Sequence, residues 1–159
     1  MPSDPITLRP ASEMDESLLL AWANDPVTRA AGFAPDPIAP DEHRAWLAAR
    51  IRSTSSRLLI GMLGDTPIGH VRLDAEPGGR VEVGIAVAPE ARGQGIGRRL
   101  LQAAMDEARA DASLGATAFT ARIRPENAAS IALFSGAGFR QTGELEMNGL
   151  RGLLYEADV

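Results

Sequence analysis

The chain contains no lysine and no cysteine, and all 16 of its basic residues are arginine. A P-loop needs a lysine against the phosphates and a Schiff-base enzyme needs a lysine nucleophile, so both classes are excluded. The lack of cysteine excludes thiol nucleophiles, disulfides and cysteine-based metal sites. The two histidines, His43 and His70, lie far apart in the sequence. They form no helical pair of metal ligands, so we expect no metal site.

Positive charge is also scarce. The net charge is -5, from 21 acidic and 16 basic residues, which argues against nucleic acid as a partner. No apolar run approaches the ~20 residues of a membrane span. The segment Met1–Asp4 lacks the basic-then-apolar pattern of a signal peptide. We therefore expect no membrane partner and a cytoplasmic location.

The length of 159 residues fits one domain, 1–159, because no internal repeat or Pro/Gly-rich linker separates two core-forming halves. The pattern predicts a strand at 6–9 and then two helices. Ser12 stands three residues before Asp15, as in a capping box, and Asn24–Pro26 ends the first helix. The second helix, which follows the loop 33–40, is expected to turn three apolar side chains inward: Trp46, Leu47 and Ile51.

The rest of the chain alternates between strand and helix patterns. It predicts strands at 57–63, 67–73, 80–87 and 117–123, helices at 97–110 and 128–135, and a final hairpin. Asn148-Gly149 is typical of a type I′ turn between the last two strands. The expected class is α+β (mixed α/β), with one largely antiparallel sheet.

The most informative segment is the glycine-rich loop before the helix 97–110. Its glycines let backbone N–H groups approach a ligand closely, and the helix N-terminus adds its positive dipole end. Arg92, Arg98 and Arg99 make this window locally positive. The spacing matches neither a P-loop nor the dinucleotide fingerprint. The loop therefore predicts an anion site, the alternative being a helix that begins with flexible glycines.

Two segments resemble a known family. Arg92-x-x-Gly95-x-Gly97 resembles the acyl-CoA pyrophosphate signature, Arg/Gln-x-x-Gly-x-Gly/Ala, of the GNAT N-acetyltransferase superfamily. Asn127–Phe139 resembles its second block, Asn-x-x-Ala/Ser-x-x-Leu-Tyr/Phe-x-x-x-Gly-Phe. The element order agrees from Ile6 to Tyr155. The resemblance implies a sheet of about seven strands flanked by about four helices, with acetyl-CoA as co-substrate and no metal.

The resemblance also implies how the donor is bound. The sheet would splay between the strand ending at Val87 and the strand 117–123, and the pantetheine arm would lie in the gap. Backbone groups of Ile85 and Val87 would bind the pantetheine amides and the acetyl carbonyl, and an N–H donor to the oxyanion supplies about 3 kcal/mol. Asn127 would bind pantetheine or cap the next helix. The other implied cofactor contacts are Ala86, Arg92, Gly93, Gln94, Gly95, Ile96, Gly97, Arg98 and Phe134.

The implied reaction is direct attack of a primary amine on the thioester. The amine is cationic at neutral pH, so a base must remove a proton. Glu82 is the candidate general base, acting through water, and the alternative is an ordinary outward-facing strand residue. The family often has a tyrosine, which protonates the thiolate, where this chain has Phe134. Tyr155 is then a candidate general acid, although a thiol with a pKa near 8.5 leaves tolerably without one.

The acceptor is expected to lie against the first two helices. The segments 21–29 and 43–46 resemble two branches of the family, one acetylating aminosugar nucleotides and the other protein N-termini such as ribosomal-protein alanine or serine. The candidate acceptor contacts are Asn24, Arg29 and His43. We expect Trp22 and Trp46 in the core and His70 to be structural or exposed.

Three functions remain open at this point. The first is an N-acetyltransferase for a small molecule such as an aminosugar nucleotide, which we favour over a protein partner. The second is a protein N-terminal acetyltransferase, and the third is an acyl-CoA-binding domain with lost catalysis, which Phe134 would explain. The final hairpin, with Leu153-Leu154, could pair across a dimer. The chain is expected to be a monomer or a homodimer.

Overall fold

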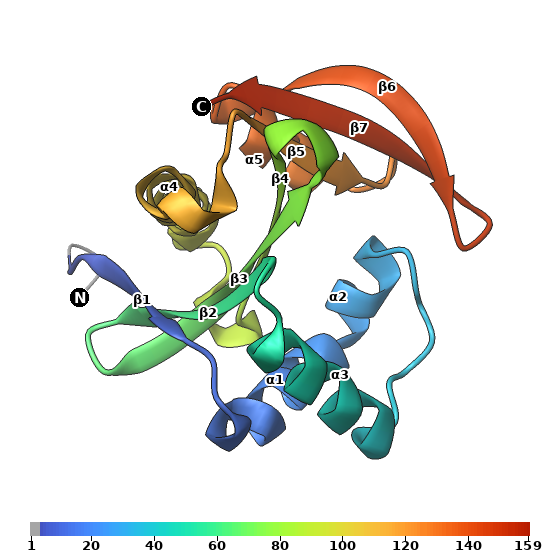
Figure 1. Cartoon of the computed structure of the whole chain (residues 1–159). Helices are drawn as coiled ribbons and strands as arrows, with labels where there is room; N and C mark the ends of the chain where they lie inside the picture. The colour runs from blue at the N-terminus through green and yellow to red at the C-terminus, as the bar shows by residue number, and fades with distance from the viewer. Residues whose placement is uncertain (1–3) are drawn as a thin grey trace.

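The computed structural model describes residues 4–159, which build a seven-stranded sheet with helices on both faces (Figure 1). The strands are β1 (Ile6–Pro10), β2 (Ser56–Leu63), β3 (Thr66–Glu76), β4 (Arg80–Val87), β5 (Ala118–Ile123), β6 (Arg140–Met147) and β7 (Leu150–Asp158). The α-helices are α1 (Glu16–Ala23), α2 (Pro26–Ala31), α3 (Pro40–Arg52), α4 (Ile96–Ala110) and α5 (Ala128–Gly136). Residues 1–3 lie outside the described residues. They are part of the segment Met1–Asp4, for which the sequence predicted no signal peptide.

The sheet has the strand order β1-β2-β3-β4-β5-β7-β6, and β4 with β5 is its one parallel pair within residues 4–159. This confirms the predicted α+β class and the mostly antiparallel sheet. The final hairpin turns at Asn148 (φ 53°) and Gly149 (φ 76°), where two positive φ angles agree with the predicted type I′ turn. Between residues 4 and 159, no helix is long and apolar enough to cross a membrane.

Helix α4 covers one face of the sheet and contacts β1, β3 and β4. Its apolar positions recur every three or four residues, so one stripe of the helix is buried. The predicted stripe is confirmed: Leu100, Leu101, Ala104, Met105 and Ala108 are all buried. This packing fixes the end of α4 that follows the glycine-rich loop.

Helices α1 and α3 cover the opposite face, beginning with the predicted capping box. Ser12 accepts from the backbone N–H of Met14, and the Asp15 carboxylate accepts from the N–H of Ser12. Arg9 donates two further hydrogen bonds to Asp15, which holds the pKa of that carboxyl below its usual value. Trp22 of α1 is buried, as predicted.

Two expectations about the N-terminal helices were wrong. Trp46 and Ile51 are 38% and 40% exposed, whereas Leu47 is 1% exposed. Helix α3 packs through positions spaced four and three residues apart, namely His43, Leu47 and Arg50, so Trp46 falls at the edge of the contact. Its ring lies 5.7 Å from the Arg50 guanidinium carbon, which covers it instead.

Helix α2 was not predicted. The segment Asn24–Pro26 does end α1, but it also starts a second helix. Asp25 caps α2 by accepting from the backbone N–H of Thr28, and Pro26 occupies the first turn, where a missing N–H costs nothing. A pattern that ends one helix therefore begins the next, and the structure has five α-helices where about four were expected.

Candidate active site

Strands β4 and β5 diverge in the middle of the sheet. They are paired over three residues, from Arg80 with Ala118 to Glu82 with Thr120. Beyond Glu82, β4 continues to Val87 without a partner on that side, and residues 84–87 are half-buried. The splay implied by the sequence resemblance is therefore present. It leaves an unpaired strand edge in the interior of the sheet, where backbone groups need a hydrogen-bonding partner.

The unpaired edge of β4 presents backbone donors. The N–H of Ala88 donates to the carbonyl of Ile68 at 2.8 Å, so it points toward β3. Backbone groups of successive strand residues point to alternate sides. The N–H groups of Ile85 and Val87 therefore point away from β3, toward the divergent β5. The N–H of Ala86 points toward β3.

The loop after β4 is shaped for an anion. Gly93 and Gly95 have φ angles of 77° and 74°, a region that favours glycine. A side chain at either position would project into open space, with no atom within 4 Å. Gly95 is the N-cap of α4, and no side chain of residues 4–159 caps this end of the helix. The loop and the positive end of the helix dipole therefore suit the pyrophosphate of acetyl-CoA, and the donors on β4 suit its amide-bearing arm.

Arg92 connects this loop to the N-terminal helices. Its guanidinium donates to the Asp25 carboxylate at 2.6 Å and to the Thr28 hydroxyl at 3.1 Å, at the start of α2. Hydrogen bonding from Arg92 lowers the pKa of Asp25. The Arg92 side chain is thus held by α2, which leaves its backbone on the loop. The side chain of Arg98 is exposed beside it.

Two residues of the second sequence block have roles within the fold. Asn127 caps α5 by accepting from the backbone N–H of Ser130 at 3.1 Å, which confirms the capping interpretation. Phe134 is 4% exposed and packs edge-on against Phe139, with ring centroids 5.0 Å apart. A cofactor contact of either side chain stays a prediction.

Glu82 lies on the sheet face that is covered by α1 and α3, which we call the Glu82 face. Arg122 of β5 binds the Glu82 carboxylate at 2.6 Å and that of Glu76 at 2.7 Å. Thr120 adds a hydrogen bond to Glu76 at 2.9 Å. Arg122 therefore fixes Glu82 where β4 and β5 part, and one ion pair leaves the carboxylate with further acceptor capacity.

Tyr155 lies on the other face of the sheet. It is paired with Ala121 of β5, a neighbour of Arg122, and is 6% exposed. Adjacent strand residues point to opposite faces, so Tyr155 and Glu82 do not meet on one face. Tyr155 is instead on the face that α4 covers.

The three predicted acceptor contacts are held in different ways. The Asn24 amide donates to and accepts from the backbone of Ile38, at 2.9 and 2.8 Å, and so holds the loop between α2 and α3. His43 is 2% exposed with its ring against Trp46, and burial lowers the pKa of this imidazole. Arg29 donates to the backbone oxygen of Asp36, while its buried Nε has no partner.

Sequence reasoning missed the polar residues of β3 and β5 that share the Glu82 face. Arg72 is paired with Gly84 of β4, and His70 with Ala86. Enclosure of the imidazole, stacked on Trp22 at 6.3 Å, lowers the pKa of His70 to about 3. The period-two alternation of the strand 67–73 could have placed His70 and Arg72 on one face.

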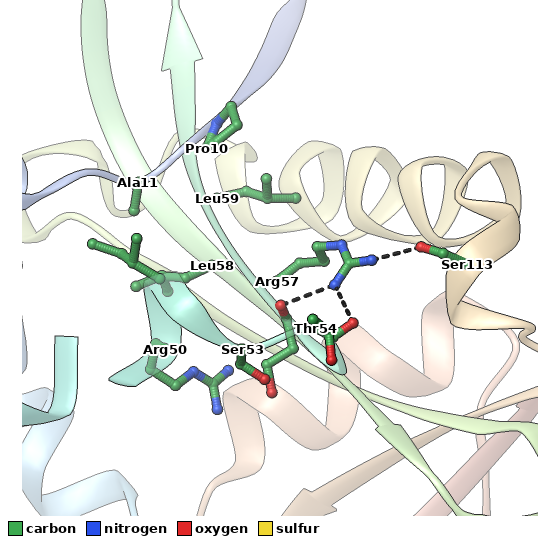
Figure 2. A pocket seen from close by; sticks show the side chains of 11 residues that line it. Pro10, Ala11, Arg50, Ser53, Thr54, Arg57, Leu58, Leu59 and Ser113 are labelled. Atoms are coloured by element: carbon green, nitrogen blue, oxygen red, sulfur yellow. Dashed lines mark hydrogen bonds between the residues drawn. The ribbon is translucent and has the colours of Figure 1, made fainter. Parts of the chain in front are cut away.

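A separate cavity of about 530 Å³ lies where α3 ends and β2 begins (Figure 2). Its wall includes Arg57, which donates to the carbonyls of Thr54 and Ser56 and to the Ser113 hydroxyl. Strands β2 and β4 run in the same direction because each is antiparallel to β3. The cavity therefore lies at the end of the sheet away from the glycine-rich loop.

Comparison with known proteins identifies a family. The family model described as the acetyltransferase (GNAT) domain matches residues 6–140. The L-methionine sulfoximine/L-methionine sulfone acetyltransferase of Pseudomonas aeruginosa is 32% identical over 149 residues, which cover 90% of this chain and 85% of that protein.

Two solved structures are similar over nearly the whole chain. Ribosomal-protein-alanine N-acetyltransferase from Brucella melitensis has a TM-score of 0.79 at 30% identity, over 96% of this chain and 99% of that one. The yncA protein of Salmonella typhimurium, solved with its cofactor acetyl-CoA, has a TM-score of 0.77 at 26% identity, over 98% and 94% of the two chains.

Proposed function

This chain belongs to the GNAT acetyltransferase family and is an N-acetyltransferase that uses acetyl-CoA, and we propose that it acetylates the primary amine of a small molecule. The observation that carries the proposal is the unpaired edge of β4, which leads through the short 3-10 helix Pro89–Ala91 into the glycine-rich loop. Acetyl-CoA supplies an acetyl group activated as a thioester. Residues of this chain bind the donor, remove the proton of the amine and stabilise the developing negative charge.

The donor is held mainly by backbone groups. The N–H groups of Ile85 and Val87 bind the amide-bearing arm, and that of Val87 donates to the acetyl oxygen, where negative charge grows during attack. The segment 92–98 and the first turn of α4 bind the pyrophosphate. Gly93 and Gly95 support this assignment because their positive φ angles turn the backbone without a side chain.

Glu82 receives the proton of the acceptor amine, directly or through one water. Its position beside the divergence of β4 and β5, fixed by Arg122 at 2.6 Å, supports this role. The neutral amine then attacks the acetyl carbonyl and a C–N bond forms. The C–S bond breaks, the thiolate leaves, and the nitrogen releases its second proton to water, which supplies the proton that the thiolate takes up. Phe134 has no proton to give, so we propose that water protonates the thiolate, with Tyr155 as the weaker candidate because it lies on the opposite face.

The acceptor is a small molecule in this proposal. The 32% identical relative from Pseudomonas aeruginosa is named for two small amino acids, which supports this size class. An aminosugar nucleotide, the sequence-based prediction, belongs to the same class. The second candidate is a protein N-terminus, which the 30% identity to the ribosomal-protein-alanine enzyme favours.

The test is thiol release from acetyl-CoA with a panel of amines: L-methionine sulfone, an aminosugar nucleotide, spermidine and an alanine-starting peptide. We expect turnover with at least one small amine and little with the peptide. The Glu82→Gln variant should lower kcat by a factor of about 100 or more while acetyl-CoA binding is retained. Turnover confined to the peptide would support the second candidate. Tight coenzyme A binding with no turnover on any amine would support a binding domain without catalysis.

A further inference from the structure

Arg72 is an arginine without an anionic partner inside the candidate site. It lies on β3 and is half-buried, and its side chain makes no hydrogen bond or ion pair within residues 4–159. The two other arginines on this part of the face have ion pairs. Arg50 is paired with Asp74 at 2.8 Å, and Arg122 with Glu76 and Glu82. A half-buried guanidinium has lost part of its hydration and gains most from an oxyanion.

The guanidinium of Arg72 lies over Gly84 of β4. A methyl group added at Gly84 would come within 2.6 Å of Nη2 and 3.1 Å of the guanidinium carbon. The missing side chain therefore makes room for this cation against the strand. Gly84 directly precedes Ile85, whose N–H points to the unpaired edge. Arg72 is thus fixed beside the place where the acetyl donor binds in the proposed function.

Arg72 and Glu82 stand close together on one face. Arg72 is opposite Gly84, and Glu82 is two residues before Gly84 on the same strand. Two residues of a strand span about 7 Å, so the Arg72 guanidinium over Gly84 and the Glu82 side chain are neighbours on this face. An acceptor with an amine near Glu82 would carry any adjacent anionic group toward Arg72.

The described carboxylates on this part of the Glu82 face form their ion pairs with arginines other than Arg72. Asp74 accepts from Arg50 and from the Ser56 hydroxyl, and Glu76 accepts from Arg122 and Thr120. The adjacent His70 stays uncharged at neutral pH because burial lowers its pKa to about 3. Among the arginines that the structure describes on this part of the Glu82 face, Arg72 is therefore the one without an ion pair.

We propose that Arg72 binds an oxyanion of the acceptor, most simply the carboxylate next to the amine of an amino acid, and so determines acceptor specificity. This inference rests on the proposed function. A planar guanidinium can donate two parallel hydrogen bonds to a carboxylate, which fixes its orientation as well as its position. A phosphate of an aminosugar nucleotide has the same chemistry, and the arms of the experiment separate the two sources.

The experiment compares acceptors that differ only in the anionic group. L-methionine sulfone and its carboxamide form one matched pair, with an aminosugar nucleotide and spermidine as further arms. We expect the anionic member to have a kcat/KM about 10- to 100-fold higher, the effect of a charge-assisted hydrogen-bonded pair. Arg72→Gln should remove this preference by raising KM for the anionic acceptor, with KM for acetyl-CoA unchanged. Arg72→Lys should restore part of it.

Two further variants complete the test. Arg52→Gln changes an exposed arginine at the end of α3 and should leave both KM values unchanged. Gly84→Ala displaces the Arg72 guanidinium and should weaken the same preference. Melting curves report whether each variant is folded.

Binding is measured as well, by the thermal shift that each acceptor gives to the protein saturated with coenzyme A. A larger shift with the acid than with the amide, lost in Arg72→Gln, supports the inference even without turnover. A preference for the aminosugar nucleotide assigns the oxyanion to its phosphate. Equal use and equal binding of acid, amide and spermidine would overturn the inference while leaving acetyl transfer intact. Failure of the proposed function would instead appear as no turnover on any amine.

Discussion

His70 ionises far from the ordinary range of an imidazole. Its pKa falls from 6.5 to about 3 because the ring is buried, and the charges of Arg72 and Arg50 act in the same direction. The native state therefore resists protonation of this imidazole. An unfolded chain does not resist it, since the ring is then hydrated.

This difference predicts an acid sensitivity of the fold. Between pH 6.5 and about 3 the unfolded chain binds a proton at His70 that the native protein does not. Stability is therefore lost as the pH falls below 6.5, by up to about 1.4 kcal/mol per pH unit. Urea unfolding at pH 7.5 and 5.0 measures this change in the free energy of unfolding. His70→Gln should lose about 2 kcal/mol less than the unsubstituted protein over this interval. Parallel losses in the two proteins would contradict a neutral, buried His70.

Glu82 and Arg122 form an ion pair of which the sequence identified only one member. The sequence singled out Glu82 by its place on the strand before the glycine-rich loop. It did not single out Arg122, which lies 40 positions further along and becomes a neighbour only through the parallel pairing of β4 with β5. The side chain that fixes a candidate base can thus be as important as the base, and it is the harder one to find.

At the scale of elements, the glycine-rich loop and the start of α4 form one unit. Gly95 has a φ of 74° and is the residue from which α4 begins. Gly115 has a φ of 60° and ends the short 3-10 helix at 112–114, away from this loop. Neither position has an atom within 4 Å of an added Cβ. The two glycines are therefore matched in backbone conformation and in local space.

Substitution of either glycine by alanine should destabilise the fold to a similar extent. The left-handed region costs a residue with a Cβ about 1 to 2 kcal/mol, so urea unfolding should report a comparable loss for Gly95→Ala and Gly115→Ala. Only Gly95→Ala should also raise KM for acetyl-CoA, by about tenfold or more, because its methyl group enters the anion site. Equal KM values for acetyl-CoA in the two variants would contradict the assignment of the loop to the binding site.

Helix α2 is held against the glycine-rich loop by Arg92. Arg92 binds Asp25 and Thr28, so the first residue of the pyrophosphate signature also fixes the helix that follows α1. The sequence predicted Arg92 for the cofactor and Asn24 and Arg29 for the acceptor as separate sets. The structure joins these two regions through a single guanidinium.

At the scale of the whole molecule, the sheet consists of two parts with a narrow connection. Strands β1 to β4 and strands β5 to β7 are joined by three residue pairs between β4 and β5. Arg122 adds ion pairs to Glu76 and Glu82, and Arg80 adds one to Glu156. A molecule bound between the diverging strands would contact both parts.

Coenzyme A should therefore stabilise the entire chain. At 100 times its dissociation constant, a ligand that binds only the native state adds about 2.7 kcal/mol to the free energy of unfolding. For a chain of this length, that corresponds to a rise in Tm of about 5 to 10 °C. Differential scanning fluorimetry with coenzyme A and with adenosine measures this rise in Tm. A shift below about 2 °C at saturation would contradict binding across the divergence.

The sequence by itself determined the parts of this protein that depend on near neighbours. The stripe of α4, the Ser12 capping box and the Asn148-Gly149 turn were all predicted, because helix periodicity and positive φ angles are set within a few residues. The glycine-rich loop followed for the same reason. Together with Asn127–Phe139, it was enough to indicate the family.

The tertiary structure alone decided which side chains meet. It exposed Trp46 and put Tyr155 on the face away from Glu82. It also left the Arg72 side chain, beside Gly84, without a partner among residues 4–159. The exposure of Trp46 depends on which side of α3 packs against the rest of the fold. The positions of Tyr155 and Arg72 depend on the register between strands far apart in the chain. A shift of one residue in that register would move every side chain of a strand to the other face, and with it the charges that surround the site.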